Sequence, residues 1–200
     1  MEKTRLFFFL GQSGAGKDTQ VTKVKRFLKE KKIRFIYVSM GDEVRKFSGR
    51  GPMRYFRKHM HDINSQAKLQ PSIFPIFFFL SKVIRKYFGD EVIIVNGSPR
   101  SKEELLLWKQ LIDTGYLPSA TIINLEVSDE ECWKRLLVRG RSDSSDPEKL
   151  NTKLGWYKPV RKMLSEELPE GFDLVTIDGE KDEKLVFQDL QDFFKKELQL

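Results

Sequence analysis

Residues 7–20 read FFFLGQSGAGKDTQ, an apolar run that enters a glycine-rich loop and then a helical pattern. The apolar run does not alternate with polar residues, which is typical of a strand buried on both faces of a parallel sheet. After the last glycine, apolar residues recur at three- and four-residue spacing as far as Glu30. A buried strand that passes through a tight turn into a helix is a building unit of α/β folds, so this segment predicts that fold class.

The rest of the chain repeats this alternation of strand and helix. We expect strands at Arg5–Leu10, Phe35–Ser39, Val92–Asn96, Thr121–Glu126 and Leu174–Asp178. We expect helices at Lys17–Glu30, Ser101–Ile112, Asp129–Arg139 and Glu183–Leu198. The pattern predicts a doubly wound, five-stranded parallel sheet, in which right-handed crossovers place ligand-binding loops at the carboxyl ends of the strands.

Two segments exceed a minimal strand–helix repeat. Residues 42–88 insert about three helices between the second and third strands, and residues 139–152, RGRSDSSDPEKLNT, form a short polar loop. A chain of 200 residues is long enough for one well-buried core and short for two. We therefore expect a single domain over residues 1–200 that carries these two insertions.

Composition narrows the possible partners. The formal net charge of +7 suits phosphates, nucleic acids or anionic membranes. A nucleic-acid partner is not expected, since it would rest on net charge alone and no run of five like charges occurs. The apolar run of residues 73–80 is far shorter than the ~20 residues that span a bilayer, so no membrane partner is expected. Cys132 is the single cysteine, which excludes an internal disulfide and fits a reducing cytoplasm.

The segment from Gly11 to Lys17 has the glycine, four residues, glycine, lysine spacing of a phosphate-binding loop. Glycines let backbone N–H groups curl around a phosphate, and the N-terminus of the following helix adds partial positive charge. The lysine ammonium then reaches the outer phosphates. The alternative is a glycine-rich turn that binds no ligand, but the strand, the lysine and the helix all favour the phosphate site.

The stretch GQSGAGKDTQ also resembles the loop of adenylate kinases and the related nucleoside monophosphate kinases. The resemblance implies an ATP site formed by Gly11, Ser13, Gly14, Ala15, Gly16, Lys17, Asp18 and Thr19, with Lys17 also catalytic. Asp18 stands where the family usually has glycine. It either favours the first helical turn, by about 0.3–1 kcal/mol, or helps Thr19 to hold Mg²⁺ through water. No structural zinc is expected, because the four cysteines of zinc-bearing relatives are missing.

Two further segments resemble the part of the family that holds the monophosphate. Residues 39–45, SMGDEVR, resemble the threonine–glycine–aspartate–x–x–arginine motif, and residues 96–100, NGSPR, resemble aspartate–glycine–phenylalanine–proline–arginine. Asp42 reads as a helix N-cap, and Asn96 replaces the family's magnesium-holding aspartate. The resemblance implies a binding site for the monophosphate made of Met40, Gly41, Arg45, Leu69, Gly97, Arg100 and Glu104. Arg45 and Arg100 would clamp the phosphate, and Glu104 would accept a hydrogen bond from the base.

The segment after the fourth strand resembles the hinge and lid of the family. The resemblance implies that Arg135 and Gly179 lie near the donor base and that Arg139 lies near the donor phosphates. Arg141 and Lys153 would join Lys17, Arg100 and Arg139 as catalytic cations, with lysine at position 153 replacing the usual arginine. Phosphoryl transfer needs positioned positive charge and no covalent nucleophile.

The sequence therefore favours a kinase that uses ATP and Mg²⁺ to phosphorylate a nucleoside monophosphate. AMP is favoured, while GMP and CMP stay open. A catalytically weakened nucleotide-binding relative is the alternative, because Asp18, Asn96 and Lys153 depart from the family pattern. A switch GTPase is disfavoured, since neither of its asparagine–lysine–x–aspartate and aspartate–x–x–glycine motifs occurs. Relatives with one such domain are commonly monomers, so a monomer is expected.

Overall fold

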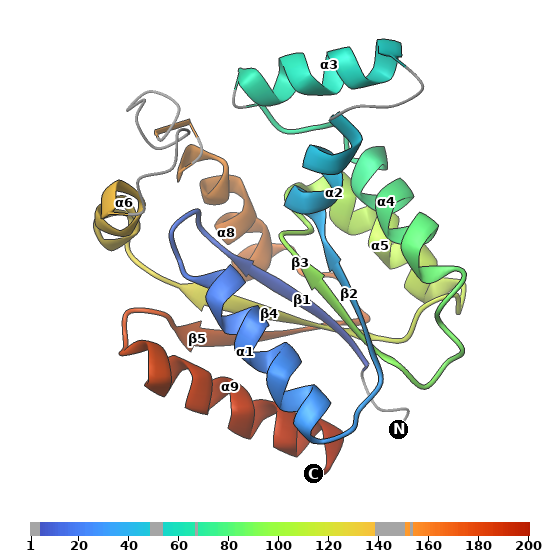
Figure 1. The fold of residues 1–200 in the computed structure, drawn as a ribbon, viewed down its shortest axis with the longest axis vertical. Coiled ribbons are helices and arrows are strands. Elements are labelled where there is room, and N and C mark those ends of the chain that lie inside the picture. The colour runs from blue at the N-terminus through green and yellow to red at the C-terminus, as the bar shows by residue number, and fades with distance from the viewer. Residues whose placement is uncertain (1–4, 49–53, 67, 139–150, 153) are drawn as a thin grey trace.

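The computed structural model describes residues 5–48, 54–66, 68–138, 151–152 and 154–200 (Figure 1). Its centre is a parallel five-stranded sheet in the order β2-β3-β1-β4-β5. The strands are β1 (Leu6–Gly11), β2 (Phe35–Ser39), β3 (Val92–Asn96), β4 (Ala120–Glu126) and β5 (Phe172–Asp178). Because β1 is central, the glycine loop that follows it lies in the middle of the carboxyl edge, between the ends of β3 and β4.

Helices follow the strands in the alternation that the sequence predicts. They are α1 (Lys17–Glu30), α2 (Met40–Ser48), α3 (Arg54–Ser65), α4 (Ile73–Val83), α5 (Lys102–Asp113), α6 (Asp129–Val138), α8 (Tyr157–Glu166) and α9 (Glu183–Leu198). Three of them, α2, α3 and α4, lie between β2 and β3, as expected for the insertion of residues 42–88. Among the described residues, no helix is long and apolar enough to cross a membrane.

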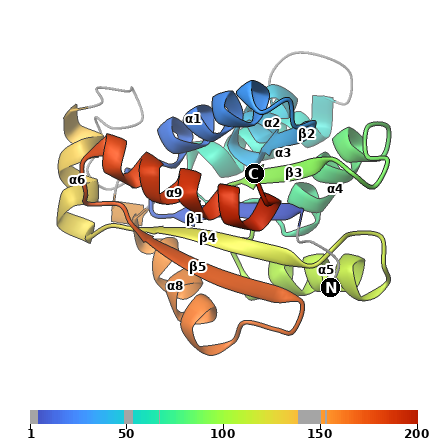
Figure 2. The same cartoon turned by 90° about the horizontal axis from the view of Figure 1, so that it is seen from below.

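The sheet is covered on both faces, which explains the unbroken apolar runs of its inner strands. In β1, Phe7 and Phe9 belong to a core that α1, α6 and α9 complete. Leu6, Phe8 and Leu10 point the other way, into a core that α4, α5 and α8 complete. Figure 2 shows this layering, with α1 and α9 above the strands and α5 and α8 below them. β1 and β3 are buried along their whole length, and they hold the two loops of the candidate site between them.

Several details differ from the sequence prediction. β5 starts at Phe172 and is exposed at four of its seven positions, because it is the edge of the sheet. α2 starts at Met40, so Asp42 is not the N-cap as predicted. It lies in the first turn, and its N–H donates to the Ser39 hydroxyl at 3.3 Å.

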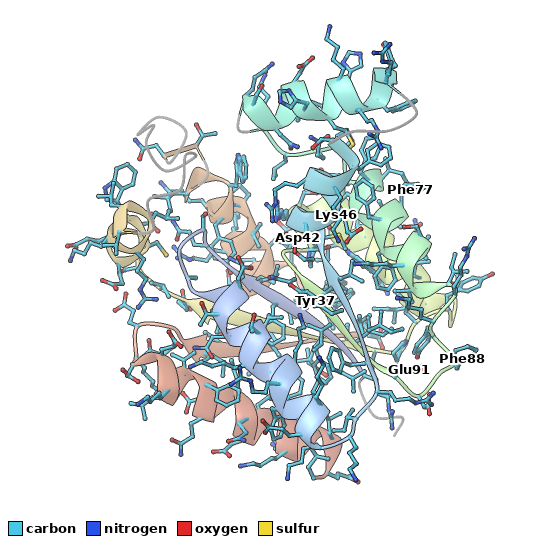
Figure 3. The ribbon with its side chains drawn as sticks, viewed as in Figure 1. Tyr37, Asp42, Lys46, Phe77, Phe88 and Glu91 are labelled. Carbon is cyan, nitrogen blue, oxygen red and sulfur yellow. The ribbon has the colours of Figure 1, made fainter. Side chains whose placement is uncertain are left out.

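The phenylalanine-rich helix α4 is only partly core, although an apolar run such as residues 73–80 favours full burial. Phe78 and Phe79 are buried, Phe74 is half-buried, and Phe77 is 52% exposed. Figure 3 shows Phe77, and Phe88 beyond the end of the helix, on the outer side of the molecule. One face of α4 therefore packs on the sheet while the other faces solvent.

Candidate active site

The glycine loop between β1 and α1 has a backbone that side chains would obstruct. Gly11 has φ 139°, and a Cβ there would lie 2.6 Å from the carbonyl oxygen of Leu125. Gly14 has φ 94°, and its Cβ would lie 2.6 Å from the carbonyl oxygen of Cys132. L-residues rarely adopt these backbone conformations, and both positions press against neighbouring backbone, so glycine is required at each. The loop is thus fitted against the end of β4 and the start of α6.

Lys17 bends back over this loop at the N-terminus of α1. Its Nζ donates hydrogen bonds to the carbonyl oxygens of Gly11 at 2.6 Å and of Gln12 at 2.8 Å. Gly16, with φ 86°, is the N-cap, which leaves the first backbone N–H groups of α1 at the loop. The loop therefore combines an ammonium group with the positive end of a helix, which is the arrangement that binds anionic phosphate.

The loop after β3 brings Arg100 to the same place. The Gly97 N–H donates to the Phe9 carbonyl at 3.0 Å, which fixes this loop beside β1. Gly97 has φ 81°, and a Cβ there would lie 2.7 Å from Nη2 of Arg100, so the guanidinium group occupies the space that glycine leaves. One cavity contains both loops and the start of α8; its walls are Leu10, Gly11, Gln12, Ser13, Lys17, Gly97, Pro99, Arg100, Trp156, Tyr157 and Val160.

Arg45, on α2, is the second arginine near this cavity. Its Nη2 is paired with Oδ1 of Asp42 at 2.5 Å, and its Nη1 lies 3.2 Å from where a Gly41 Cβ would be. Burial lowers the pKa of Arg100, and the positive charge of Arg45 lowers it further, while the negative charges of Glu104 and Asp18 raise it. Arg45 does not line the cavity, but its positive charge would also favour an anion bound at Arg100.

Asp18 and Asn96 connect the two loops. The Asn96 Nδ2 donates to Oδ1 of Asp18 at 2.8 Å and to the hydroxyl of Tyr37 at 3.3 Å. Tyr37 lies on β2 directly below the start of α2, where Figure 3 also shows Asp42. Asn96 is buried, and its Oδ1 has no hydrogen-bond partner within the described part of the chain. The carboxylate of the first α1 turn is therefore held at the end of the strand where the family has its own aspartate.

These residues fit Mg²⁺ held together with a nucleotide. Mg²⁺ keeps several waters and needs only one or two carboxylates besides substrate phosphates. Asp18 supplies a carboxylate, Thr19 a hydroxyl, and the unpartnered Asn96 Oδ1 an acceptor for a metal-bound water. No cluster of three or more His, Cys, Asp or Glu that would hold a metal by itself occurs among the described residues.

Glu104, which the resemblance assigns to the acceptor base, is hydrogen-bonded inside the protein. It is 3% exposed, its Oε1 accepts a hydrogen bond from the Ser98 hydroxyl, and its Oε2 accepts from the Arg100 N–H at 2.9 Å. The reason is local: Ser101 caps α5, so position 104 lies in the first turn, facing back under the loop. Both carboxylate oxygens are thereby engaged inside the protein.

Arg135 and Gly179, which the resemblance assigns to the donor base, come from α6 and from the loop after β5. Arg135 on α6 donates from Nη1 to the Gly179 carbonyl at 2.9 Å, and its Nε pairs with Glu131 at 2.8 Å. A Cβ on Gly179 would lie 2.6 Å from Val127 Cγ2, so glycine permits this close packing. The two residues that the resemblance places at the donor base are thus in direct contact.

The structure places the remaining predicted residues as follows. Leu69 and Arg100 line a second cavity together with Trp156. Met40 is buried in the core. Arg139, Arg141 and Lys153 lie outside the described residues.

Sequence reasoning missed Trp156 and Tyr157, which form one wall of the first cavity. The Tyr157 hydroxyl donates to Oδ1 of Asn124 on β4, and burial raises its pKa. Their signal in the sequence is the stretch KLGWY, residues 153–157, in which the two aromatic residues closely follow Lys153. Cys132 is buried, and burial raises its thiol pKa to about 11, so it is no nucleophile for this site.

Comparison with known proteins agrees with this geometry. Residues 10–151 match the family model of an AAA domain. An adenylate kinase of Prochlorococcus marinus (strain MIT 9515) is 28% identical over 183 residues, covering 92% of this chain and 94% of the relative. A uridylate kinase of Schizosaccharomyces pombe is 27% identical over 191 residues, covering 92% and 94%. An adenylate kinase of Corynebacterium diphtheriae is 27% identical over 172 residues, covering 86% and 88%.

The AAA-domain match covers more than half of the chain and begins inside β1, at the entrance to the glycine loop. The similarity to the two adenylate kinases and the uridylate kinase covers between 86% and 92% of this chain. The chain is therefore a P-loop protein of the AAA-domain family and belongs to the adenylate kinase and nucleoside monophosphate kinase family.

Proposed function

We propose that the chain transfers the γ-phosphate of ATP to a nucleoside monophosphate, giving ADP and a nucleoside diphosphate. The observation that carries the proposal is the shared cavity of Lys17 and Arg100. Lys17 belongs to the loop that holds donor phosphates, and Arg100 belongs to a different loop, so two phosphate-binding elements face one space. A protein that only hydrolysed a triphosphate would need the first element alone.

The residues would act by positioning and by charge. The glycine loop and Lys17 hold the outer phosphates of ATP, while Arg45 and Arg100 hold the acceptor phosphate. Bound Mg²⁺ would neutralise charge on the donor phosphates, with Asp18 and Thr19 as the nearest candidates to hold it. Positive charge on both sides of the transferred group stabilises the transition state. Arg139, Arg141 and Lys153 are proposed to complete it from the lid at residues 139–152.

Acceptor choice is the finer part of the proposal. AMP is favoured, because adenylate kinases are prominent among the similar proteins. The uridylate kinase shows nearly the same similarity, so UMP joins GMP and CMP as an alternative. The helices of residues 42–88 would form the acceptor-binding arm. We expect a monomer, in the cytoplasm because of the single buried cysteine.

A catalytically weakened relative is the second candidate. It is favoured by Asn96, an amide in a buried position where the family has a carboxylate. In that case the chain would bind ATP and a monophosphate without turnover.

Incubation with ATP, Mg²⁺ and each of AMP, GMP, CMP and UMP tests the proposal. Separation of the nucleotides by chromatography should show ADP together with one new diphosphate. A weakened relative would bind both nucleotides in calorimetry but form no product. Release of inorganic phosphate with no acceptor dependence would contradict the proposal.

A further inference from the structure

Beneath the loop that follows β3, four residues form a continuous chain of hydrogen bonds: Trp108, Ser98, Glu104 and Arg100. The Trp108 Nε1–H donates to the Ser98 hydroxyl oxygen at 2.8 Å, and the Ser98 hydroxyl donates to Glu104. The other oxygen of Glu104 accepts from the backbone N–H of Arg100 at 2.9 Å. Trp108 and Ser98 are fully buried, so solvent does not compete for these bonds.

The carboxylate has a second relation to Arg100, through charge. The Arg100 guanidinium is close enough to Arg45 for the two positive charges to repel, and Glu104 offers Arg100 the compensating negative charge. The other acidic residue that raises the pKa of Arg100 is Asp18, on the opposite loop. Glu104 thus fixes the backbone of Arg100 and lies close enough to act on its charge, while burial raises the pKa of Glu104 itself.

From these contacts we propose that Glu104 is a positioning residue for the phosphate clamp and does not read the acceptor base. The proposal rests on the proposed function, since it assigns Glu104 a role in holding the acceptor. Each oxygen of this carboxylate already accepts a hydrogen bond, and the side chain is only 3% exposed, which leaves little access for a base. Its removal should therefore weaken every acceptor alike, because all monophosphates carry the same phosphate.

Two substitutions remove the charge and the hydrogen bonds of Glu104 to different extents. Glu104→Gln keeps the size, but its single side-chain oxygen can accept from the Arg100 N–H or from the Ser98 hydroxyl and not from both as the carboxylate does, so it removes the charge and one of the two hydrogen bonds. Glu104→Leu removes both the charge and the acceptor, which leaves a buried N–H unpaired. Asp113→Asn is the matched control, because it removes an exposed carboxylate at the other end of α5.

The experiment measures KM and kcat of each variant for AMP, GMP, CMP and UMP at saturating ATP. Glu104→Leu should raise the acceptor KM by a common factor, on the order of 10- to 100-fold. Glu104→Gln should raise it less, with the order of acceptor preference and the KM for ATP unchanged. A changed order of acceptors would overturn the proposal in favour of base reading, and an unchanged acceptor KM in folded Glu104→Leu would overturn it outright.

If Glu104→Leu does not fold, Ser98→Ala and Glu104→Gln carry the test. Ser98→Ala removes the hydroxyl that holds one oxygen of Glu104, so it too should raise the KM for all acceptors equally. The proposed function fails separately, if the wild-type chain phosphorylates no monophosphate. Calorimetric titration with AMP, in wild type and in Glu104→Gln, then decides the inference: weaker binding in the variant supports it, and equal binding overturns it.

Discussion

The side-chain amide of Asn96 donates a hydrogen bond of 2.8 Å to the carboxylate of Asp18. This bond joins the end of β3 to the first turn of α1 and places a negative charge where the family usually has one on the strand itself. In this chain the carboxylate of the pair is Asp18 on α1, and the amide is Asn96 on β3. We propose that this pair supports Mg²⁺ without an acidic residue at position 96.

Asp18→Asn should therefore raise the Mg²⁺ concentration needed for half-maximal binding of a fluorescent ATP analogue, by about 10-fold for the loss of one charged ligand interaction. The swapped double variant, Asp18→Asn with Asn96→Asp, should restore the wild-type value, because the pair regains one carboxylate and one amide. Equal Mg²⁺ dependence in wild type and in Asp18→Asn would remove any role of Asp18 toward the ion.

Gly97→Ala should weaken acceptor use far more than Gly41→Ala. At Gly97 the added Cβ would meet Nη2 of Arg100 at 2.7 Å, with φ at 81°, whereas at Gly41 it would lie 3.2 Å from the flexible end of exposed Arg45. The strained backbone should also cost about 1–2 kcal/mol of stability. Urea unfolding and the KM values for AMP and ATP measure both effects. A Gly97→Ala variant with wild-type acceptor KM would show that Arg100 is not held by this contact.

The Cys132 thiol should be inert in the native protein. Its pKa is raised to about 11 by burial, so only about one thiol in a thousand is ionised at pH 8. A disulfide reagent should label it slowly in buffer and at once in 6 M guanidinium chloride. Rapid labelling of the folded chain would show that α6 opens easily.

The raised pKa of Cys132 also makes the stability of the fold depend on pH. The native pKa is above the unfolded value of 9.0, so the native state keeps its proton longer. The contribution of the Cys132 thiol to the free energy of unfolding is full below pH 9 and is lost as the pH rises toward 11. Cys132→Ala should flatten this part of the stability curve, while an unchanged alkaline slope would assign it to other groups.

Most of the fold was predictable, because the buried strands are unbroken apolar runs and each helix repeats apolar residues at helical spacing. The bounds of α1, α9, β2 and β3 agree with the prediction. The errors came from tertiary context: β5 is exposed as an edge strand, Phe77 faces outward, and Asp42 lies inside a helix that starts two residues earlier.

For the site, the sequence predicted which residues gather but not how they contact each other. Lys17 and Arg100 follow the ends of adjacent parallel strands, so their meeting follows from topology. The bond between Asp18 and Asn96 spans 78 positions, and no local pattern reveals it. The hydrogen bonds of Glu104 were not predictable from the sequence. Its side chain meets Ser98 only because the loop after β3 folds over the first turn of α5.

Transfer of γ-labelled phosphate from ATP to AMP tests directly whether the chain is a nucleoside monophosphate kinase. Wild-type protein, Arg45→Ala, Arg100→Ala and the control Asp113→Asn would be compared with AMP as acceptor. We expect label in ADP for the wild type and the control. Each arginine variant should have an acceptor KM at least about 10-fold higher, because it loses a charged contact to the phosphate. Label released only as inorganic phosphate, or an acceptor KM that is unchanged in both arginine variants, would contradict the proposed reaction.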